Sequence, residues 1–232
     1  MTPYVNYKQP GRSRLWTGDR VVKVLAIRQA IRAAMLVAAG LLLGACSQSV
    51  VVKTDFPEPL VEPLPLKVGL HYDPELTDYS YTEDLPSDVT WSFTLGDVNT
   101  KLFDGAFNAL FEQTIRVDDT GGTGDPYDGL NAVIEPTLEA FEFSLPRQSR
   151  SEQYAVWIRY RLNVYTPDGT LITGWPVSAY GQSDSRAFGK NDAMGQAAIN
   201  ALRDAFASIV IGFAKEPQIK AALIPESADD ES

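Results

Sequence analysis

The sequence has very few residues that cross-link a fold or bind metal: one cysteine, Cys46, and one histidine, His71, among 232 residues. A single cysteine excludes an internal disulfide framework, and one residue of each type excludes a closed Cys/His zinc site. Basic residues are also scarce, with 20 Lys and Arg against 30 Asp and Glu. This balance argues against nucleic-acid binding, which needs clustered basic residues, and we expect no cofactor.

The few basic residues are unevenly distributed. Residues 1–45 contain seven Lys and Arg and one acid, a net charge of +6. Residues 46–232 contain 13 basic and 29 acidic residues, a net charge of −16. A basic stretch that precedes an apolar run is typical of an export signal, because the cations stay on the cytoplasmic side while the run enters the bilayer.

Long hydrophobic runs are absent as well. The longest uncharged apolar run, residues 33–45, has thirteen residues, whereas a membrane-spanning helix needs about 20. The run ends in Leu43-Gly44-Ala45-Cys46, which resembles the lipobox of bacterial lipoproteins. The alternative is that Cys46 is a small buried residue at the end of a core helix.

The lipobox resemblance implies a chemistry for this segment. Residues 1–45 are then a lipoprotein signal peptide, cleaved between Ala45 and Cys46. Diacylglyceryl is attached to the Cys46 thiol, and the new amino terminus is acylated, as with palmitate. Several acyl chains hold a domain on a membrane essentially permanently. Ser47 and Gln48 follow, with no Asp at the second position, and this pattern resembles lipoproteins of the cell outer membrane that face the periplasm.

Residues 46–66 are rich in proline, which fixes φ and extends the preceding residue. We predict a stiff, lipidated tether that lifts the domain off the membrane. The alternative is an edge chain that packs along the domain, with Val50, Val51, Phe56 and Leu60 in a groove.

For residues 67–223 we predict an α+β domain. Its antiparallel sheet is a meander, and two helices pack on one face of that sheet. We predict that residues 224–232 form a flexible acidic tail. The strand between 132 and 145 changes its apolar phase, which predicts a bulge near Ala140. Candidate strands are residues 67–72, 90–95, 132–145, 154–165 and 171–182, and residues 118–129 are a predicted loop.

Two helices show apolar residues at three- and four-residue spacing. The first opens at Gly96, with Asp97 as the predicted N-cap. The second begins near Asn191 or Asp192 and is predicted to end at Pro217. The predicted buried residues are Val98, Leu102, Phe103, Ala106, Phe107, Leu110 and Phe111 in the first, and Met194, Ala197, Ala198, Ala201, Leu202, Ala205, Phe206, Ile209 and Phe213 in the second.

This order of strands and helices after a lipobox resembles envelope lipoproteins of the YajG type, transport-auxiliary lipoproteins and the periplasmic domain of the curli secretion channel protein. The resemblance covers about residues 67–213. It implies an adaptor or assembly component rather than a catalyst.

Residues suited to catalysis or metal binding are few. His71 lies in a strand-like run, where a structural role is the default. Four aspartates in the predicted loop admit a calcium site, but their spacing differs from an EF-hand and a solvated turn is the simpler interpretation. These are Asp118, Asp119, Asp125 and Asp128. We therefore predict no catalytic residues and no metal ligands.

The outward side chains of strand 154–165 are better candidates. Trp157, Arg159, Arg161 and Tyr165 have the composition of binding hot spots, and we predict that they contact a partner. The alternative is that the arginines form cross-strand pairs with Glu139 or Asp184.

The sequence predicts a non-enzymatic, outer-membrane-anchored lipoprotein that binds or assembles with another envelope protein. The alternative is an auxiliary lipoprotein of a lipid or solute transport system that holds an apolar ligand. An envelope hydrolase is the third possibility.

Overall fold

A computed structural model of the chain describes residues 46–224, apart from 87–88, 150, 185 and 187–188. The predicted signal peptide and most of the predicted acidic tail lie outside the described residues. The helices are α2 (Pro74–Thr77), α3 (Gly96–Leu110), α4 (Pro146–Ser149), α5 (Lys190–Gly212) and α6 (Pro217–Leu223), with a 3-10 turn at Phe213–Lys215. The strands are β1 (Cys46–Val51), β2 (Leu64–Leu70), β3 (Ser80–Leu85), β4 (Val89–Thr94), β5 (Phe111–Arg116), β6 (Ala132–Ser144), β7 (Gln153–Tyr165) and β8 (Leu171–Asp184).

The larger sheet has five strands in the order β5-β2-β6-β7-β8. Its β6-β7-β8 part is the predicted antiparallel meander, and the register shift between Leu138 and Ala140 is the predicted bulge. The sheet is mixed rather than purely antiparallel, because β2 pairs in parallel with both β5 and β6. Parallel partners need a long crossover, and here α2, β3, β4 and α3 make it.

A second, three-stranded sheet has the order β1-β4-β3. We expected only its β4 strand; β3 falls between the predicted strands 67–72 and 90–95, where we predicted no strand, and β1 falls in the predicted tether. Val50 and Val52 are buried, and the Phe56 ring stacks on Phe206 with ring centroids 5.1 Å apart. Leu60, by contrast, is fully exposed. Residues 46–56 thus pack along the domain through Val50 and Phe56, as the alternative for this segment expects, but not through Val51, which is 58% exposed.

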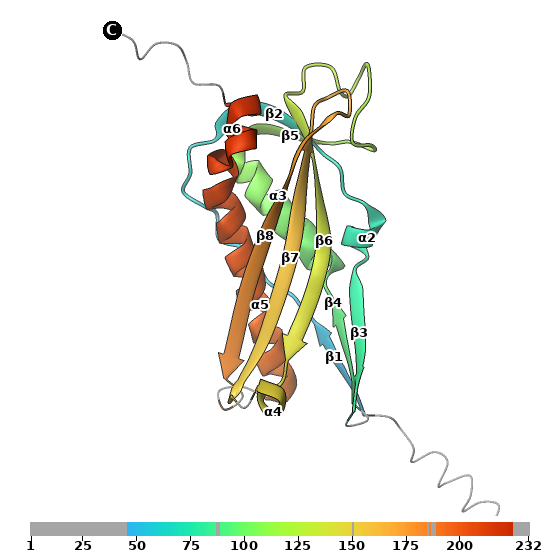
Figure 1. Cartoon of the computed structure of the whole chain (residues 1–232), viewed down its shortest axis with the longest axis vertical. Coiled ribbons are helices and arrows are strands. Elements are labelled where there is room, and N and C mark those ends of the chain that lie inside the picture. The colour runs from blue at the N-terminus through green and yellow to red at the C-terminus, as the bar shows by residue number, and fades with distance from the viewer. Residues whose placement is uncertain (1–45, 87–88, 150, 185, 187–188, 225–232) are drawn as a thin grey trace, which may run out of the picture. The chain divides into compact units, whose positions relative to one another are not determined.

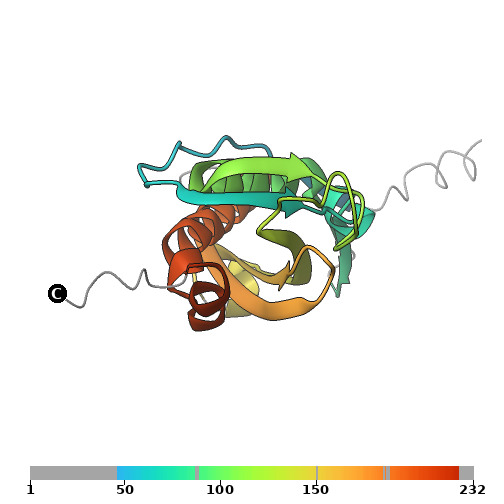
Figure 2. The same ribbon diagram turned by 90° about the horizontal axis from the view of Figure 1, so that it is seen from above.

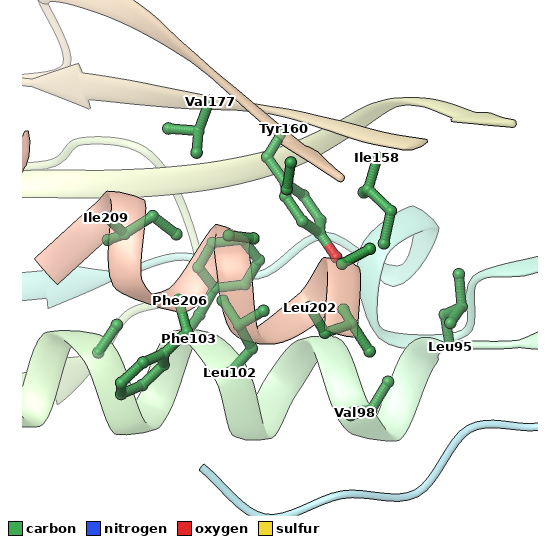
Figure 3. Packing of buried hydrophobic residues seen from close by; sticks show 14 of the residues in the cluster. Leu95, Val98, Leu102, Phe103, Ile158, Tyr160, Val177, Leu202, Phe206 and Ile209 are labelled. Atoms are coloured by element: carbon green, nitrogen blue, oxygen red, sulfur yellow. The ribbon is translucent and has the colours of Figure 1, made fainter. Parts of the chain in front are cut away.

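Helices α3 and α5 cover one face of the larger sheet, which curves around them (Figures 1 and 2). Every residue of the two predicted apolar stripes is buried. Figure 3 shows Tyr160 pointing from β7 toward the helices, where its ring meets Phe103 edge-on. The small sheet closes the remaining part of the core, with Phe93 against Phe141 at 4.8 Å between ring centroids.

The helix ends differ from the predictions. Leu95, not Asp97, is the N-cap of α3, and it makes no side-chain capping bond. The turn is instead set by a close approach at Gly96, where a Cβ would lie 1.9 Å from the carbonyl oxygen of Thr77. Helix α5 ends at Gly212, and Pro217 begins α6 rather than ending α5. Proline suits the first helical position because its missing N–H has no intrahelical partner there.

Among the described residues, the helical stretch Asp192–Lys215 is long and apolar enough to cross a membrane. Its apolar stripe is buried in the domain core, however, and Met194, Leu202 and Ile209 are completely covered. Helix α5 is therefore apolar because it is a core helix.

Candidate functional site

The predicted lipidation residue, Cys46, is the first residue of β1. It lies in register with Val89 of β4, and Val89 lies opposite Leu85 of β3. Leu43, Gly44 and Ala45 of the predicted lipobox, and with them the predicted cleavage bond, lie outside the described residues. The residue predicted to carry the lipid is thus itself paired in the small sheet.

The predicted partner-binding residues lie on the open face of the larger sheet, opposite the helices. Trp157 of β7 is 43% exposed and lies directly across from Tyr180 of β8, which is 42% exposed. The two ring centroids are 5.1 Å apart. Exposed, packed aromatic rings of this kind present a large apolar area at a small cost in side-chain entropy. We call Trp157, Tyr180, Arg159 and Arg161 the sheet-face patch.

The two arginines of the patch share one carboxylate. Glu139 of β6 lies between them, with Oε2 3.2 Å from Nε of Arg159 and Oε1 accepting from Nε of Arg161. Arg161 also donates from Nη1 to the carbonyl oxygen of Gly174 at 2.9 Å. The cross-strand pairing with Glu139 that the alternative predicted is thus present, whereas Asp184 accepts from the backbone of Arg186. Glu142, in register with Trp157 on the same face, supplies a second carboxylate, so two carboxylates accompany the two guanidinium groups there.

Tyr165, the fourth predicted partner-binding residue, belongs to a different environment at the far end of β7. Its hydroxyl donates to Glu135 at 2.9 Å, and Asn163 donates to the same carboxylate oxygen at 3.1 Å. Burial, followed by the hydrogen bond to Glu135, raises the pKa of Tyr165 to about 12. Its ring packs against the small buried cluster of Val117, Leu130 and Val133. The structure therefore separates Tyr165 from the sheet-face patch.

His71 lies immediately after β2 and takes part in the same polar group. Its Nδ1 is 3.4 Å from the carbonyl oxygen of Val117, and its Nε2 is 4.0 Å from Oε1 of Glu135. These are contacts that fix the end of a strand. Within the part of the chain that the structure describes, no three His, Cys, Asp or Glu residues converge as metal ligands. The four aspartates of the predicted loop belong to no such group.

An apolar groove lies between the proline-rich segment and the outer surface of α5. It has a volume of about 740 Å³. Arg203 lines it too and donates to Thr54 at 3.4 Å. The signal in the sequence was Phe56 and Val61, two apolar residues among the prolines of this segment. The apolar lining residues include Phe56, Pro57, Pro59, Val61, Phe206 and Ile211.

No protein-family model and no curated protein matches the chain. A solved protein from Xanthomonas campestris, of the family DUF330, is 11% identical over 71% of this chain and 91% of its own, with a TM-score of 0.44. A Helicobacter pylori protein described as a homolog of neuraminyllactose-binding hemagglutinin is 12% identical over 71% and 93%, with a TM-score of 0.44. A minor lipoprotein from Acinetobacter baumannii is 10% identical over 66% and 94%, with a TM-score of 0.36. Similarity at this level concerns the arrangement of strands and helices alone.

Proposed function

We propose that this protein is a lipoprotein of the bacterial outer membrane that faces the periplasm and binds another envelope protein without catalysing a reaction. The observation that carries the proposal is the sequence Leu43-Gly44-Ala45-Cys46 at the end of a basic and then apolar segment. The charge changes from +6 before Cys46 to −16 from Cys46 onward, and the folded domain begins at the same residue.

The anchor is tested by expressing the full chain in a Gram-negative bacterium. Radiolabelled palmitate should enter the parent protein and the Ser47→Ala variant, and both should fractionate with the outer membrane. The Cys46→Ala variant should take up no label and leave the membrane fraction, because the thiol that accepts the diacylglyceryl group is gone. Incorporation into Cys46→Ala, or none into the parent, contradicts the anchor.

The sheet-face patch supports a binding role. Trp, Tyr and Arg dominate the energetics of protein interfaces, and the Trp157–Tyr180 pair beside Arg159 combines all three. Arg159 is half-exposed while it contacts Glu139. A carboxylate on a partner can therefore reach the guanidinium group without unfolding the sheet.

Crosslinking in intact cells tests this surface. The Trp157→Ala/Arg159→Ala variant should lose a crosslinked partner that the parent protein captures, with little change in stability because both side chains are partly exposed. The matched control is Ile211→Ala/Arg203→Ala, which removes an exposed apolar residue and an arginine from the groove instead. Equal capture by both variants and the parent contradicts the sheet-face patch as the binding surface.

The groove favours a second function, an auxiliary lipoprotein of a lipid or solute transport system. Its walls are mostly apolar, and Arg203 supplies a cation for an anionic head group, although the carboxylate of Asp55, which pairs with Lys101, lines the groove as well. Lipid should then be extracted from the purified parent protein and be lost from Ile211→Glu. Leu171→Glu places the same charge on a similarly exposed residue of β8 and should retain the lipid. A purified protein free of lipid contradicts this second function.

A further inference from the structure

The proline-rich segment before β2 forms a stiff loop with an apolar tip. Between residues 56 and 65, every residue except Leu60 and Val61 is a proline or directly precedes one. Proline fixes its own φ and keeps the preceding residue extended, so both stems of the loop are stiff. Leu60 at the tip is fully exposed, and Figure 2 shows the segment as an open loop that leaves the body of the domain. We call residues 57–63 the proline loop.

Both ends of the proline loop are held by the domain. The Phe56 ring, directly before the loop, stacks on Phe206 of α5. Leu64, directly after it, lies in register with Phe111 of β5. A loop with stiff stems and fixed ends loses little conformational freedom when its tip binds. Burial of the Leu60 side chain is therefore favourable and is opposed by only a small ordering cost.

The apolar groove lies beside this tip. Pro59 and Val61 line the groove, whereas the exposed side chain of Leu60 between them does not. On the wall formed by α5, Ile211 lines the groove and is still 61% exposed. One surface of the domain thus carries an apolar tip and an apolar groove, and the tip does not fill the groove of its own chain.

Arg203, which lines the groove, lacks an acidic partner among the described residues. Of the five arginines whose side chains the structure describes, the other four contact a carboxylate. Arg203 donates instead to the Thr54 hydroxyl at 3.4 Å. Two acids lie close by, but Asp55 contacts Lys101 at 3.5 Å and Asp204 accepts from a backbone amide of β8. The groove therefore offers an uncompensated guanidinium group.

Glu58 and Glu62 give the tip the opposite charge. Both are exposed, and in the part of the chain that the structure describes no cation lies within 4.0 Å of either carboxylate. A carboxylate and a guanidinium group form a strong, charge-assisted pair when they meet. Arg203 and these two glutamates do not meet within one chain, whereas a second copy can bring them together.

We propose that two copies of this chain form a two-fold dimer, in which the Leu60 tip of each copy enters the apolar groove of the other. The glutamates beside each tip then meet Arg203 of the opposite copy. Because one surface supplies both the tip and the groove, the contact is isologous and closes at two copies. A second copy is favoured over a lipid because it covers Leu60 as well as the groove. The sheet-face patch, on the far side of the sheet from the helices, stays free for its own partner.

The association is measured with residues 46–232, which contain the whole hydrophobic core, under reducing conditions. Sedimentation velocity should detect a dimer at about 100 μM protein, since small interfaces reach micromolar affinity. Leu60→Glu should raise the dissociation constant at least about tenfold. The matched control is Leu171→Glu, which places the same charge on another exposed leucine and should dimerise like the parent.

A charge exchange tests the pairing of the tip with the groove. Arg203→Glu and Glu58→Arg/Glu62→Arg should each be monomeric, because like charges then face each other in both contacts. When they are mixed, opposite charges face each other again and a heterodimer should form. The control partner for labelled Arg203→Glu is Asp118→Arg/Asp119→Arg, which carries the same added charge on a distant exposed loop and should bind it at least about tenfold more weakly.

A parent protein that stays monomeric at this concentration overturns the proposal, and so does a dimer that Leu60→Glu leaves intact. Assemblies larger than two copies overturn the two-fold closure. Equal binding of labelled Arg203→Glu to both partners overturns the pairing of tip and groove. A monomer that is purified with lipid in the groove assigns the groove to lipid instead. None of these results depends on lipidation of Cys46 or on the sheet-face patch.

Discussion

The Tyr160 hydroxyl donates a hydrogen bond of 2.7 Å to Oδ1 of Asn99, and both side chains are completely buried. The Asn99 amide in turn donates to the carbonyl oxygen of Leu76 at 3.3 Å. This chain of polar contacts joins β7 to α3 and α2 inside the core. Burial raises the pKa of Tyr160 well above its usual range, which keeps the hydroxyl a donor.

Tyr160→Phe should destabilise the domain by about 1 to 3 kcal/mol, because Oδ1 of Asn99 is then buried without a partner. Denaturant unfolding measures this free energy. The control is Tyr180→Phe, whose lost hydrogen bond to Gln182 lies at the surface; it should stay within about 0.5 kcal/mol of the parent. Equal stability of the two variants would mean that the buried hydrogen bond contributes nothing.

Gly181 is where α5 meets β8 backbone to backbone. A Cβ on this residue would lie 2.1 Å from the carbonyl oxygen of Ala197 and 2.2 Å from the amide nitrogen of Ala201. Gly181→Ala should therefore push helix and sheet apart and cost at least about 1 to 3 kcal/mol of the free energy of unfolding.

The matched control for this substitution is Gly195→Ala within α5. There a new Cβ meets only Val50, at an ordinary contact distance of 3.6 Å. Because alanine favours a helix over glycine by about 1 kcal/mol, this variant should be as stable as the parent or more stable. Thermal unfolding of the two variants compares them directly, and a Gly181→Ala protein with the parent's midpoint would refute the close packing.

Above pH 10, the free energy of unfolding should fall with rising pH, in part because of Tyr165. Its pKa is raised from 10.0 to about 12 in the folded state, so the folded protein holds this proton more tightly than the unfolded chain. The resulting stability is complete below pH 10 and is lost as the pH rises toward 12. The tyrosinate absorbance of the parent minus that of Tyr165→Phe isolates this titration.

Replacing Glu135 with Gln tests the cause of that shift. Glu135→Gln should lower the pKa of Tyr165 but leave it above 10.0, because burial, the larger cause, remains. A midpoint of the difference titration near 10.0 in the parent protein would contradict both the burial and the hydrogen bond.

The meander and the helix stripes were predictable because their signals are long and local. Strand β7 alternates between buried and more exposed residues from Val156 to Tyr165, and the phase change near Ala140 locates the bulge of β6. The short strands were not predictable. The sequence of β5, FEQTIR, is polar on an edge strand, and its parallel partner β2 is more than forty residues away. Such pairing depends on tertiary contacts rather than on local pattern.

The site was predictable in part for the same reason. The alternating side chains of β7 place Trp157, Arg159 and Arg161 on one face of the sheet. The turn at residues 166–169 reverses the chain, so that β8 pairs with β7. Tyr180 was missed as the neighbour of Trp157 because its position opposite Trp157 depends on the register of the hairpin, which includes a shift between Val164 and Tyr165. Tyr165 shares the face by parity, yet the loop that carries Val117 and Leu130 covers it.

The most direct measurement is mass spectrometry of the mature protein extracted from bacterial membranes. We predict that its first residue is Cys46, with a thioether-linked diacylglyceryl group on the sulfur and an acyl chain on the amino nitrogen. A mature protein that retains residues before Cys46, or one that begins at Cys46 with a free thiol, would contradict this account.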